Sequence, residues 1–201
     1  MANVSRISGL SPVQYLNGAP WNGQARVYCI PNSDDTNAYA IGDPVAYAGS
    51  SDTNGVPTVT LATAGTGNTV LGAIVSTGGV KYGSGLVDPN ATSDLVIPAT
   101  KTKDYYVMVC DDPNVIFEIE EESTGTAFTA AEVGLNANLV AGTNNGYVSG
   151  WMIDRTSPAV TATLQLRLLM LAQRTGNAFG DYAKWWVLIN NHSYRVGQVG
   201  I

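Results

Sequence analysis

The sequence predicts an all-β protein, a single β-barrel or β-sandwich domain of jelly-roll type with an extended N-terminal arm. Short runs of alternating apolar and polar residues recur at spacings of about ten residues, and Gly-rich turns separate them, as in small barrels and sandwiches. Of the 201 residues, 45% are hydrophobic, which is sufficient for one large core. No repeat and no clear linker interrupts the chain, so we expect an arm at residues 1–24 and a β domain at residues 25–201.

The expected arm carries isolated apolar side chains among Ser, Pro, Asn and Gly, without the period of a helix or a strand. We interpret it as a segment that packs where another surface receives it, with a plain surface loop as the alternative. Tyr15, Leu16 and Trp21 are its candidate contact residues.

The first half of the domain reads as a series of short strands. Residues 25–30, 45–48, 56–62 and 70–75 have strand character, and another strand begins at Tyr39. Breaks such as Gly42-Asp43-Pro44 and Gly65-Thr66-Gly67 separate them. Residues 78–90 read as a loop, and residues 94–97 as a weak strand that ends at Pro98.

Residues 103–122 read as one hairpin around the turn Asp111-Asp112-Pro113-Asn114. The first run is apolar or aromatic on both faces, which is typical of a central strand. In the second run apolar residues alternate with Glu118 and Glu120, which is typical of a half-buried strand. We therefore expect these two glutamates on a solvent-exposed face.

In the second half, residues 129–133 suggest a helical turn, residues 136–141 appear irregular, and residues 146–153 suggest a strand. Residues 162–172 place four apolar side chains on one face and Gln165 and Arg167 on the other, so we predict a strand there. Residues 173–181 read as a loop and residues 183–190 as the last strand. Because Trp185 and Trp186 are adjacent in it, one should lie in the core and the other should face outward at a subunit contact.

The composition narrows the range of partners. Charged residues make up only 13% of the chain, which favours a surface that packs against copies or partners. The net charge is −6 and basic residues do not cluster, which argues against nucleic acid. No apolar run is long enough to cross a membrane, and no signal peptide is expected. We expect Cys29 and Cys110 to be buried free thiols, although a disulfide is the alternative, and the chain to be made in a reducing cytoplasm.

The sequence predicts no catalytic, cofactor or metal site. His192 is the only histidine, which excludes multi-histidine metal sites and weakens any Ser-His-Asp interpretation; we expect it to end a strand. The acidic run ending at Glu122 could supply an acid–base pair or a Ca²⁺ site. An exposed edge is the favoured interpretation, and an intersubunit salt bridge is the main alternative.

Several short motifs resemble those of one family. The chain is similar to the head decoration, or cement, proteins of tailed bacteriophages in Gly42-Asp43-Pro44-Val45, which resembles that family's strand entry, and in Leu71-Gly72, which resembles its later turn. Further resemblance lies in residues 62–65, 109–113, 117–119, 176–178 and 186–192.

The resemblance implies a structural virion protein and no enzyme. It implies an exterior position on the capsid after assembly in the host cytoplasm, with the major capsid protein as partner. We expect a homo-oligomer, a trimer in preference to a dimer, with contacts through Tyr15, Leu16, Trp21, Trp185, Trp186, Glu118 and Glu120. A carbohydrate-binding or receptor-binding β domain of a phage tail or virion is the second hypothesis, and a hydrolase with paired carboxylates is the third.

Overall fold

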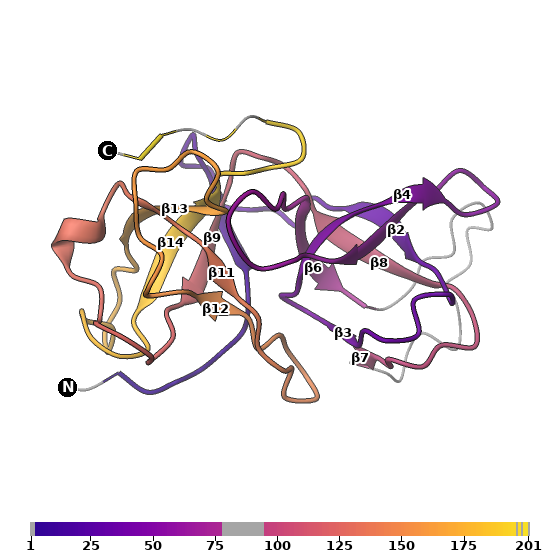
Figure 1. Ribbon diagram of the computed structural model, residues 1–201, viewed down its shortest axis with the longest axis horizontal. Helices are drawn as coiled ribbons and strands as arrows, with labels where there is room; N and C mark the ends of the chain where they lie inside the picture. The colour runs from indigo at the N-terminus through magenta and orange to yellow at the C-terminus, as the bar shows by residue number, and fades with distance from the viewer. Residues whose placement is uncertain (1–2, 78–94, 196, 198, 201) are drawn as a thin grey trace.

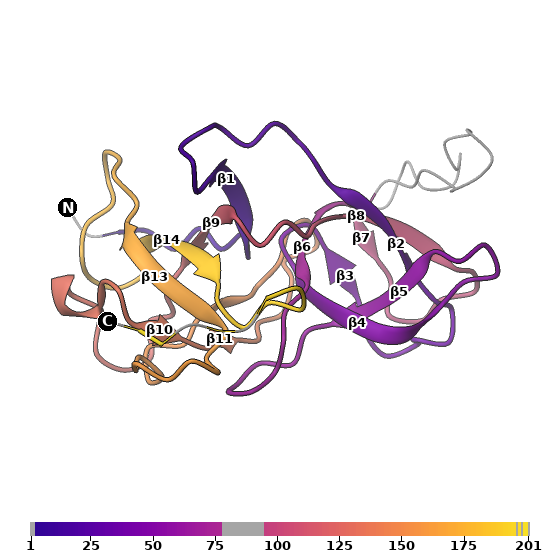
Figure 2. The ribbon, with the colours of Figure 1, turned by 90° about the horizontal axis from the view of Figure 1, so that it is seen from above.

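A computed structural model describes residues 3–77, 95–195, 197, 199 and 200, and it is all-β apart from one short 3-10 helix among them. The strands belong mainly to two five-stranded sheets that lie side by side along the long axis of the molecule (Figures 1 and 2). Both ends of the described chain lie on the side of the second sheet (Figure 1). The all-β prediction is confirmed, but the strands do not form a single jelly roll. No helix in the described ranges is long and apolar enough to cross a membrane.

The first sheet, called the closed sheet below, is built from one continuous part of the chain. Its strands pair in the order β2-β5-β4-β6-β8, and β8 pairs with β2, so the sheet closes on itself. All of these pairs are antiparallel except β2 with β5. The five strands are β2 (Arg26–Ile30), β4 (Pro44–Ser51), β5 (Pro57–Leu61), β6 (Gly72–Ser76) and β8 (Tyr105–Cys110).

The second sheet, called the open sheet, joins the two ends of the chain. Its strands pair in the order β1-β9-β14-β13-β10, and all neighbours are antiparallel. β1 comes from the expected N-terminal arm, and the other four strands follow the closed sheet in sequence. They are β1 (Ser11–Tyr15), β9 (Val115–Glu120), β10 (Asn136–Ala137), β13 (Leu166–Leu171) and β14 (Lys184–Ile189).

Two small strand pairs and one helical turn complete the fold. β3 (Tyr39–Ala40) pairs with β7 (Val96–Ile97) beside the closed sheet, and β11 (Leu139–Val140) pairs with β12 (Met152–Ile153) beside the open sheet. The 3-10 helix η1 (Ala130–Glu132) has a capping box, in which Thr129 and Glu132 bond each other's backbone. This turn is the one that residues 129–133 predicted.

Each sheet has its own hydrophobic core, and the open-sheet core also includes side chains from the closed-sheet half of the chain. The closed sheet buries side chains such as Tyr28, Val59 and Ile74, and the open sheet buries others such as Phe117 and Trp185. Four buried side chains from the closed-sheet half of the chain pack in the open-sheet core, and they are Ala62, Val70, Ala73 and Cys110. The closed-sheet half of the chain therefore contributes apolar contacts to the open-sheet core at the junction.

Gln165 adds a polar connection across this junction. The residue is fully buried. Its Nε2 donates to the carbonyl oxygen of Thr63 at 2.8 Å, and its Oε1 accepts from the backbone N–H groups of Gly65 at 3.0 Å and Leu139 at 3.1 Å. One side chain thus satisfies three backbone groups on two different segments, in one buried and two partly buried hydrogen bonds.

The expected hairpin at residues 103–122 is wrong, because its two strands belong to different sheets (Figure 1). β8 pairs with β2 and β6, whereas β9 pairs with β1 and β14. The turn exists, with the Val115 N–H donating to the Asp112 carbonyl at 3.1 Å, but it carries the chain from one sheet to the other. Both runs are apolar enough to form core strands, but β8 packs mainly in the closed-sheet core and β9 in the open-sheet core.

Most other strand predictions are confirmed to within a few residues. Residues 136–141, expected to be irregular, contain β10 and β11, and only the end of the strand expected at 146–153 forms, as β12. The loop expected at residues 78–90 and the start of the strand expected at 94–97 lie outside the described residues.

Candidate binding surfaces

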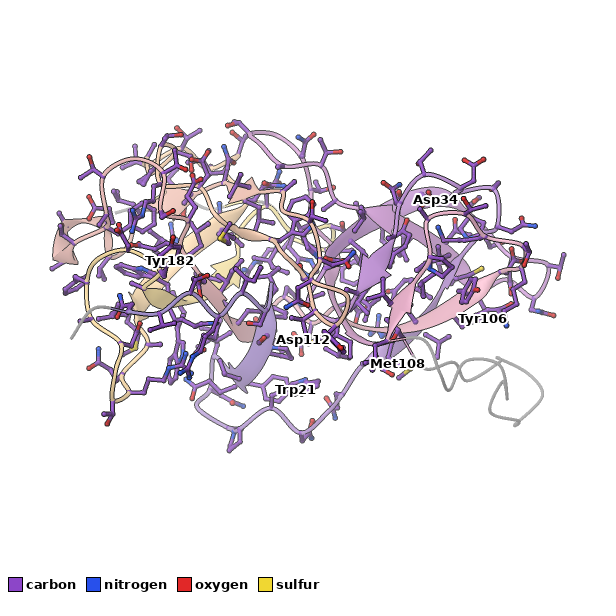
Figure 3. All side chains as sticks on the ribbon, turned by 90° about the horizontal axis from the view of Figure 1, so that it is seen from below. Trp21, Asp34, Tyr106, Met108, Asp112 and Tyr182 are labelled. Atoms are coloured by element: carbon purple, nitrogen blue, oxygen red, sulfur yellow. The ribbon has the colours of Figure 1, made fainter. Side chains whose placement is uncertain are left out.

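The three candidate residues of the expected arm differ in what they offer to a partner. The Tyr15 hydroxyl lies 3.0 Å from Asn22 Oδ1 and 3.2 Å from Gln24 Oε1, and both Tyr15 and Trp21 pack against the open-sheet core. The Trp21 Nε1 donates to the Gln24 carbonyl at 3.3 Å. Leu16, by contrast, is 48% exposed. Figure 3 shows Trp21 on the same side of the molecule as Asp112.

Glu120 does not lie on an exposed face as expected, because the first residues of the chain cover it. Its carboxylate accepts from the Ser5 hydroxyl at 2.8 Å and from the Arg6 N–H at 2.7 Å. The Lys184 ammonium lies 3.7 Å away, and Glu120 is only 1% exposed. The side chain therefore fixes the N-terminal segment, defined here as residues 3–8, onto the open sheet.

Glu118 and Glu121 are also engaged within the chain. Glu118 pairs with the half-exposed Arg174 at 2.9 Å. Glu121 is fully buried, where it accepts from Arg155 Nη2 at 2.6 Å and from Trp185 Nε1 at 3.0 Å. The acidic run therefore holds the open sheet to its neighbouring segments, and the expectation of a plain exposed edge is wrong.

The two adjacent tryptophans face opposite sides of β14, as expected. Trp185 is fully buried, and its ring meets Phe128 edge to face with the centroids 5.7 Å apart. Trp186 is half-buried and lies between Glu118 of β9 and Met170 of β13 in the strand register. Its Nε1 is buried and has no hydrogen-bond partner among the described residues.

A hollow of about 550 Å³ lies between the N-terminal segment and the loop that joins β13 to β14. We call it the basic groove, because its lining brings together three basic side chains. Its main lining residues are Asn3, Arg6, Glu118, Arg174, Tyr182 and Lys184. Tyr182 lies at the open-sheet end of the molecule, opposite Tyr106 and Asp34 (Figure 3).

The two walls of the basic groove are tied together by Asn3. Its Nδ2 donates to the carbonyl oxygens of Ala178 at 2.7 Å and Asp181 at 2.9 Å, and its Oδ1 accepts from the Ala178 N–H at 3.0 Å. Tyr182, on the loop wall, has a φ of +61°, a left-handed conformation that is costly for a tyrosine.

The charges in the groove are fixed to different degrees. Lys184 is buried and bonds the Arg6 carbonyl oxygen, and this burial lowers the pKa of its ammonium. Arg174 keeps half of its side chain exposed while it pairs with Glu118. The exposed Arg6 side chain makes no hydrogen bond or ion pair with any described residue. Arg6 and Arg174 therefore both present guanidinium groups to solvent.

The Gly42-Asp43-Pro44-Val45 motif lies where the two halves of the chain meet. Leu10 N–H donates to the Gly42 carbonyl at 2.9 Å, and Ser149 N–H donates to that of Ile41 at 2.8 Å. Gly42 has a φ of +91°, and a Cβ there would come within 2.0 Å of the Ser8 carbonyl oxygen, so only glycine fits. Buried Asp43 accepts from the Ala40 N–H at 2.7 Å, and burial raises the pKa of its carboxyl group to about 6.

A loop at residues 144–148 projects from the fold near this junction, at the lower edge of Figure 1. Its tip carries Tyr147, which is 64% exposed. Asn144 Oδ1 accepts from Gly146 N–H at 3.1 Å, and Asn145 Oδ1 accepts from the N–H groups of Tyr147 and Val148 at 3.0 Å each. Local side-chain bonds thus preform the loop.

A second hollow, of about 490 Å³, lies beside the β8–β9 turn and is lined in part by Arg26, Asp112 and Tyr194. Beneath it, Asp111 accepts from the Tyr28 hydroxyl at 2.6 Å and pairs with Arg26 at 3.3 Å. The ring of Tyr194 is partly exposed and closes the hollow on one side.

The side chains of both cysteines and of the histidine are buried. Cys29 and Cys110 are free and buried, as expected, and burial raises the pKa of each thiol to about 12. His192 follows β14 and its Nδ1 accepts from the Tyr194 N–H at 3.0 Å, while burial lowers its pKa to about 4. Within the described ranges, no group of three or more His, Cys, Asp and Glu residues could hold a metal ion.

Three features of these surfaces were missed at the sequence level: Arg6 and Arg174, the strained Tyr182, and Tyr147. Only the last has a local signal, the run Asn144-Asn145-Gly146, which is typical of a tight turn that presents the next residue. Comparison with protein-family models, with curated proteins and with solved structures found no match.

Proposed function

We propose that this chain is a structural protein of a tailed bacteriophage, a decoration or cement protein that binds the outer surface of the head. In this role it holds neighbouring major-capsid subunits together against internal pressure. It works as a homo-oligomer, with a trimer favoured, and it catalyses no reaction.

The observation that carries this proposal is the preformed loop with Tyr147 at its tip. A large aromatic side chain presented on an ordered loop loses little conformational entropy on binding, and tyrosine is enriched at the energetic centres of protein interfaces. Only 13% of the residues in the chain are charged, so its surface as a whole carries few charges. Such a surface suits permanent contact with other subunits.

The resemblance to cement proteins supports the same assignment. Its Gly42-Asp43-Pro44-Val45 motif lies at the junction of the two sheets and close to the base of the 144–148 loop, through the bond between Ser149 and Ile41. In this proposal the motif has a structural role, which is to set the position of the presented loop relative to the closed sheet.

The test is co-sedimentation of the purified chain with phage heads assembled without it. We expect saturable binding and a higher temperature of head disruption. Tyr147→Ala should weaken binding about ten-fold or more, as expected for an interface anchor, whereas Leu95→Ala, a comparably exposed apolar site, should change it less than about two-fold. Absence of co-sedimentation at saturating concentration would overturn the proposal, and a stable monomer in light scattering would count against the trimer.

The second hollow favours a second candidate, a carbohydrate-binding or receptor-binding β domain of a phage tail or virion. An exposed tyrosine ring beside carboxylates and a guanidinium group is an arrangement that can stack on and hydrogen-bond a sugar. Binding of the chain to a glycan array, lost in Tyr194→Ala and retained in Tyr147→Ala, would support this function over the first.

A further inference from the structure

We propose that the basic groove is a binding site for a carboxylate-rich segment of a partner protein. The inference deepens the proposed function, because such a segment would be an acidic patch on the major capsid protein. Three observations support it: the charge of the groove, the availability of its hydrogen-bond donors and the ordering of its walls.

The first observation is an inversion of charge. The chain has 10 Lys and Arg residues and a net charge of −6, yet three of its basic residues line this one hollow. Glu118 of the lining pairs with Arg174, and buried Glu120 lies 3.7 Å from Lys184, so two negative charges oppose the three positive ones and one net positive charge remains. A partner approaching an otherwise acidic protein would meet a local positive potential here, and a concave surface concentrates that potential.

The second observation is that two guanidinium groups are available to a ligand. Arg6 bonds to the fold through its backbone, with its N–H on Glu120 and its carbonyl oxygen accepting from Lys184, so its side chain is left for other contacts. Arg174 has one terminal nitrogen on Glu118 and half of its side chain in solvent. The planar fork of a guanidinium group matches a carboxylate in two parallel hydrogen bonds.

The third observation is that hydrogen bonds within the chain connect the two walls of the groove. The three hydrogen bonds of Asn3 fix the distance between the N-terminal segment and the β13–β14 loop. Tyr182 on that loop adopts a left-handed conformation. Because contacts within the chain order these walls, binding of a peptide there costs less conformational entropy.

The lining favours a carboxylate-bearing peptide over a polyphosphate. Glu118 in the floor repels a multiply charged phosphate more than an isolated carboxylate, and Val4 and Tyr182 add apolar surface that suits side chains. The net charge of −6 also opposes approach of a nucleic acid, whose affinity depends on many neutralised phosphates.

The test uses the full chain and a fluorescent eight-residue peptide of alternating Ser and Glu, with the Ser–Gln peptide as the uncharged control. We expect the acidic peptide to bind in fluorescence anisotropy, to bind more weakly as ionic strength rises, and to outcompete inorganic phosphate. Arg6→Ala and Arg174→Ala should each weaken binding about five-fold, as expected for a charge-assisted contact.

Arg26→Ala is the matched control, because it removes one exposed guanidinium group from the second hollow instead. It should change peptide affinity less than about two-fold. Arg174→Gln serves if Arg174→Ala fails to fold, and Arg6→Ala changes only an exposed side chain. Equal binding of both peptides, equal losses in the groove and control variants, or preferential binding of phosphate or an oligonucleotide would overturn the inference. If the chain binds the acidic peptide but not phage heads, the proposed function is wrong, whereas the assignment of the basic groove as a binding site for carboxylates stands.

Discussion

Gln165 shows how much of this fold depends on single buried polar side chains. It belongs to the chain just before β13, and its amide group satisfies backbone groups of the 62–67 segment and of β11. An amide with both donor and acceptor functions in use is hard to replace, because an apolar side chain of the same size leaves the backbone groups without partners.

We predict that Gln165→Ala destabilises the protein by about 2–4 kcal/mol, because it removes one buried and two partly buried hydrogen bonds to backbone groups and creates a cavity. The measurement is the midpoint of urea unfolding. Gln173→Ala is the control, since Gln173 is exposed and bonds only the nearby Leu171 carbonyl, and it should cost less than about 0.5 kcal/mol. A similar shift in both variants would contradict the role given to Gln165.

Asp43 should make stability depend on pH in a direction opposite to most carboxylates. Its pKa is raised from 3.8 to about 6, so the folded state holds a proton that the unfolded chain releases. The stability that this proton contributes is complete below about pH 4 and is lost as the pH rises through about 6. The loss amounts to as much as about 3 kcal/mol for a shift of about two units.

The measurement is the free energy of unfolding of the wild type and Asp43→Asn between pH 4 and pH 7. We expect the variant to gain stability relative to the wild type across this range, with the difference smallest at the acidic end. A difference that does not vary with pH would show that folding does not raise the pKa of Asp43.

Residue-level alternation predicts which side chains share a face, but not what covers that face. The alternation correctly predicts that Gln165 and Glu120 lie on the face opposite the regularly spaced apolar side chains of their strands. Both are buried all the same, because distant segments, residues 62–67 and residues 5–8, lie over them. The cause is a tertiary contact between parts of the chain far apart in sequence, and no local pattern encodes it.

At the scale of elements, strands were predictable and their partners were not. β5, β8, β9, β13 and β14 all carry strong apolar periodicity, and all were found close to their expected bounds. β8 and β9 do not pair with each other, because β8 pairs with β2 and β6 whereas β9 pairs with β1 and β14. β1 itself was missed because Ser11, Pro12 and Gln14 obscure its alternation.

We predict that deleting residues 1–21 destabilises the open sheet by about 3–5 kcal/mol or more, because it removes β1 and the fully buried Leu10. A lower unfolding midpoint and a red shift of tryptophan fluorescence should follow. Leu16→Ala changes an exposed residue of the same segment and should cost less than about 0.5 kcal/mol. An unchanged midpoint after the deletion would show that the segment is dispensable to the fold.

At the scale of the whole molecule, two sheets share one junction and should unfold together. All four tryptophans, Trp21, Trp151, Trp185 and Trp186, belong to the open-sheet side, either in its core or on β14. Tryptophan fluorescence therefore reports the open sheet, whereas far-ultraviolet circular dichroism reports both sheets.

We predict coincident urea transitions by these two probes, since apolar contacts at the junction and the hydrogen bonds of Gln165 join the two halves of the fold. Gln165→Ala should separate the two curves, because it weakens the polar connection at the junction. Separate transitions in the wild type would instead show two independent units. The overall class was predictable from composition and turn spacing, but the division into two sheets was not, because it depends on where each strand finds its partners.

The pairing of β1 with β9 has a consequence for synthesis on the ribosome. β1 is translated before the closed sheet, yet its partner begins at Val115, after the whole closed sheet has been translated. The closed sheet can complete its ring while the open sheet is missing β13 and β14, whose residues are translated later. β1 must therefore remain unpaired until β9 has been translated. We expect the yield of folded protein to rise with slow release of the chain from the ribosome, or with a chaperone that shields the nascent chain.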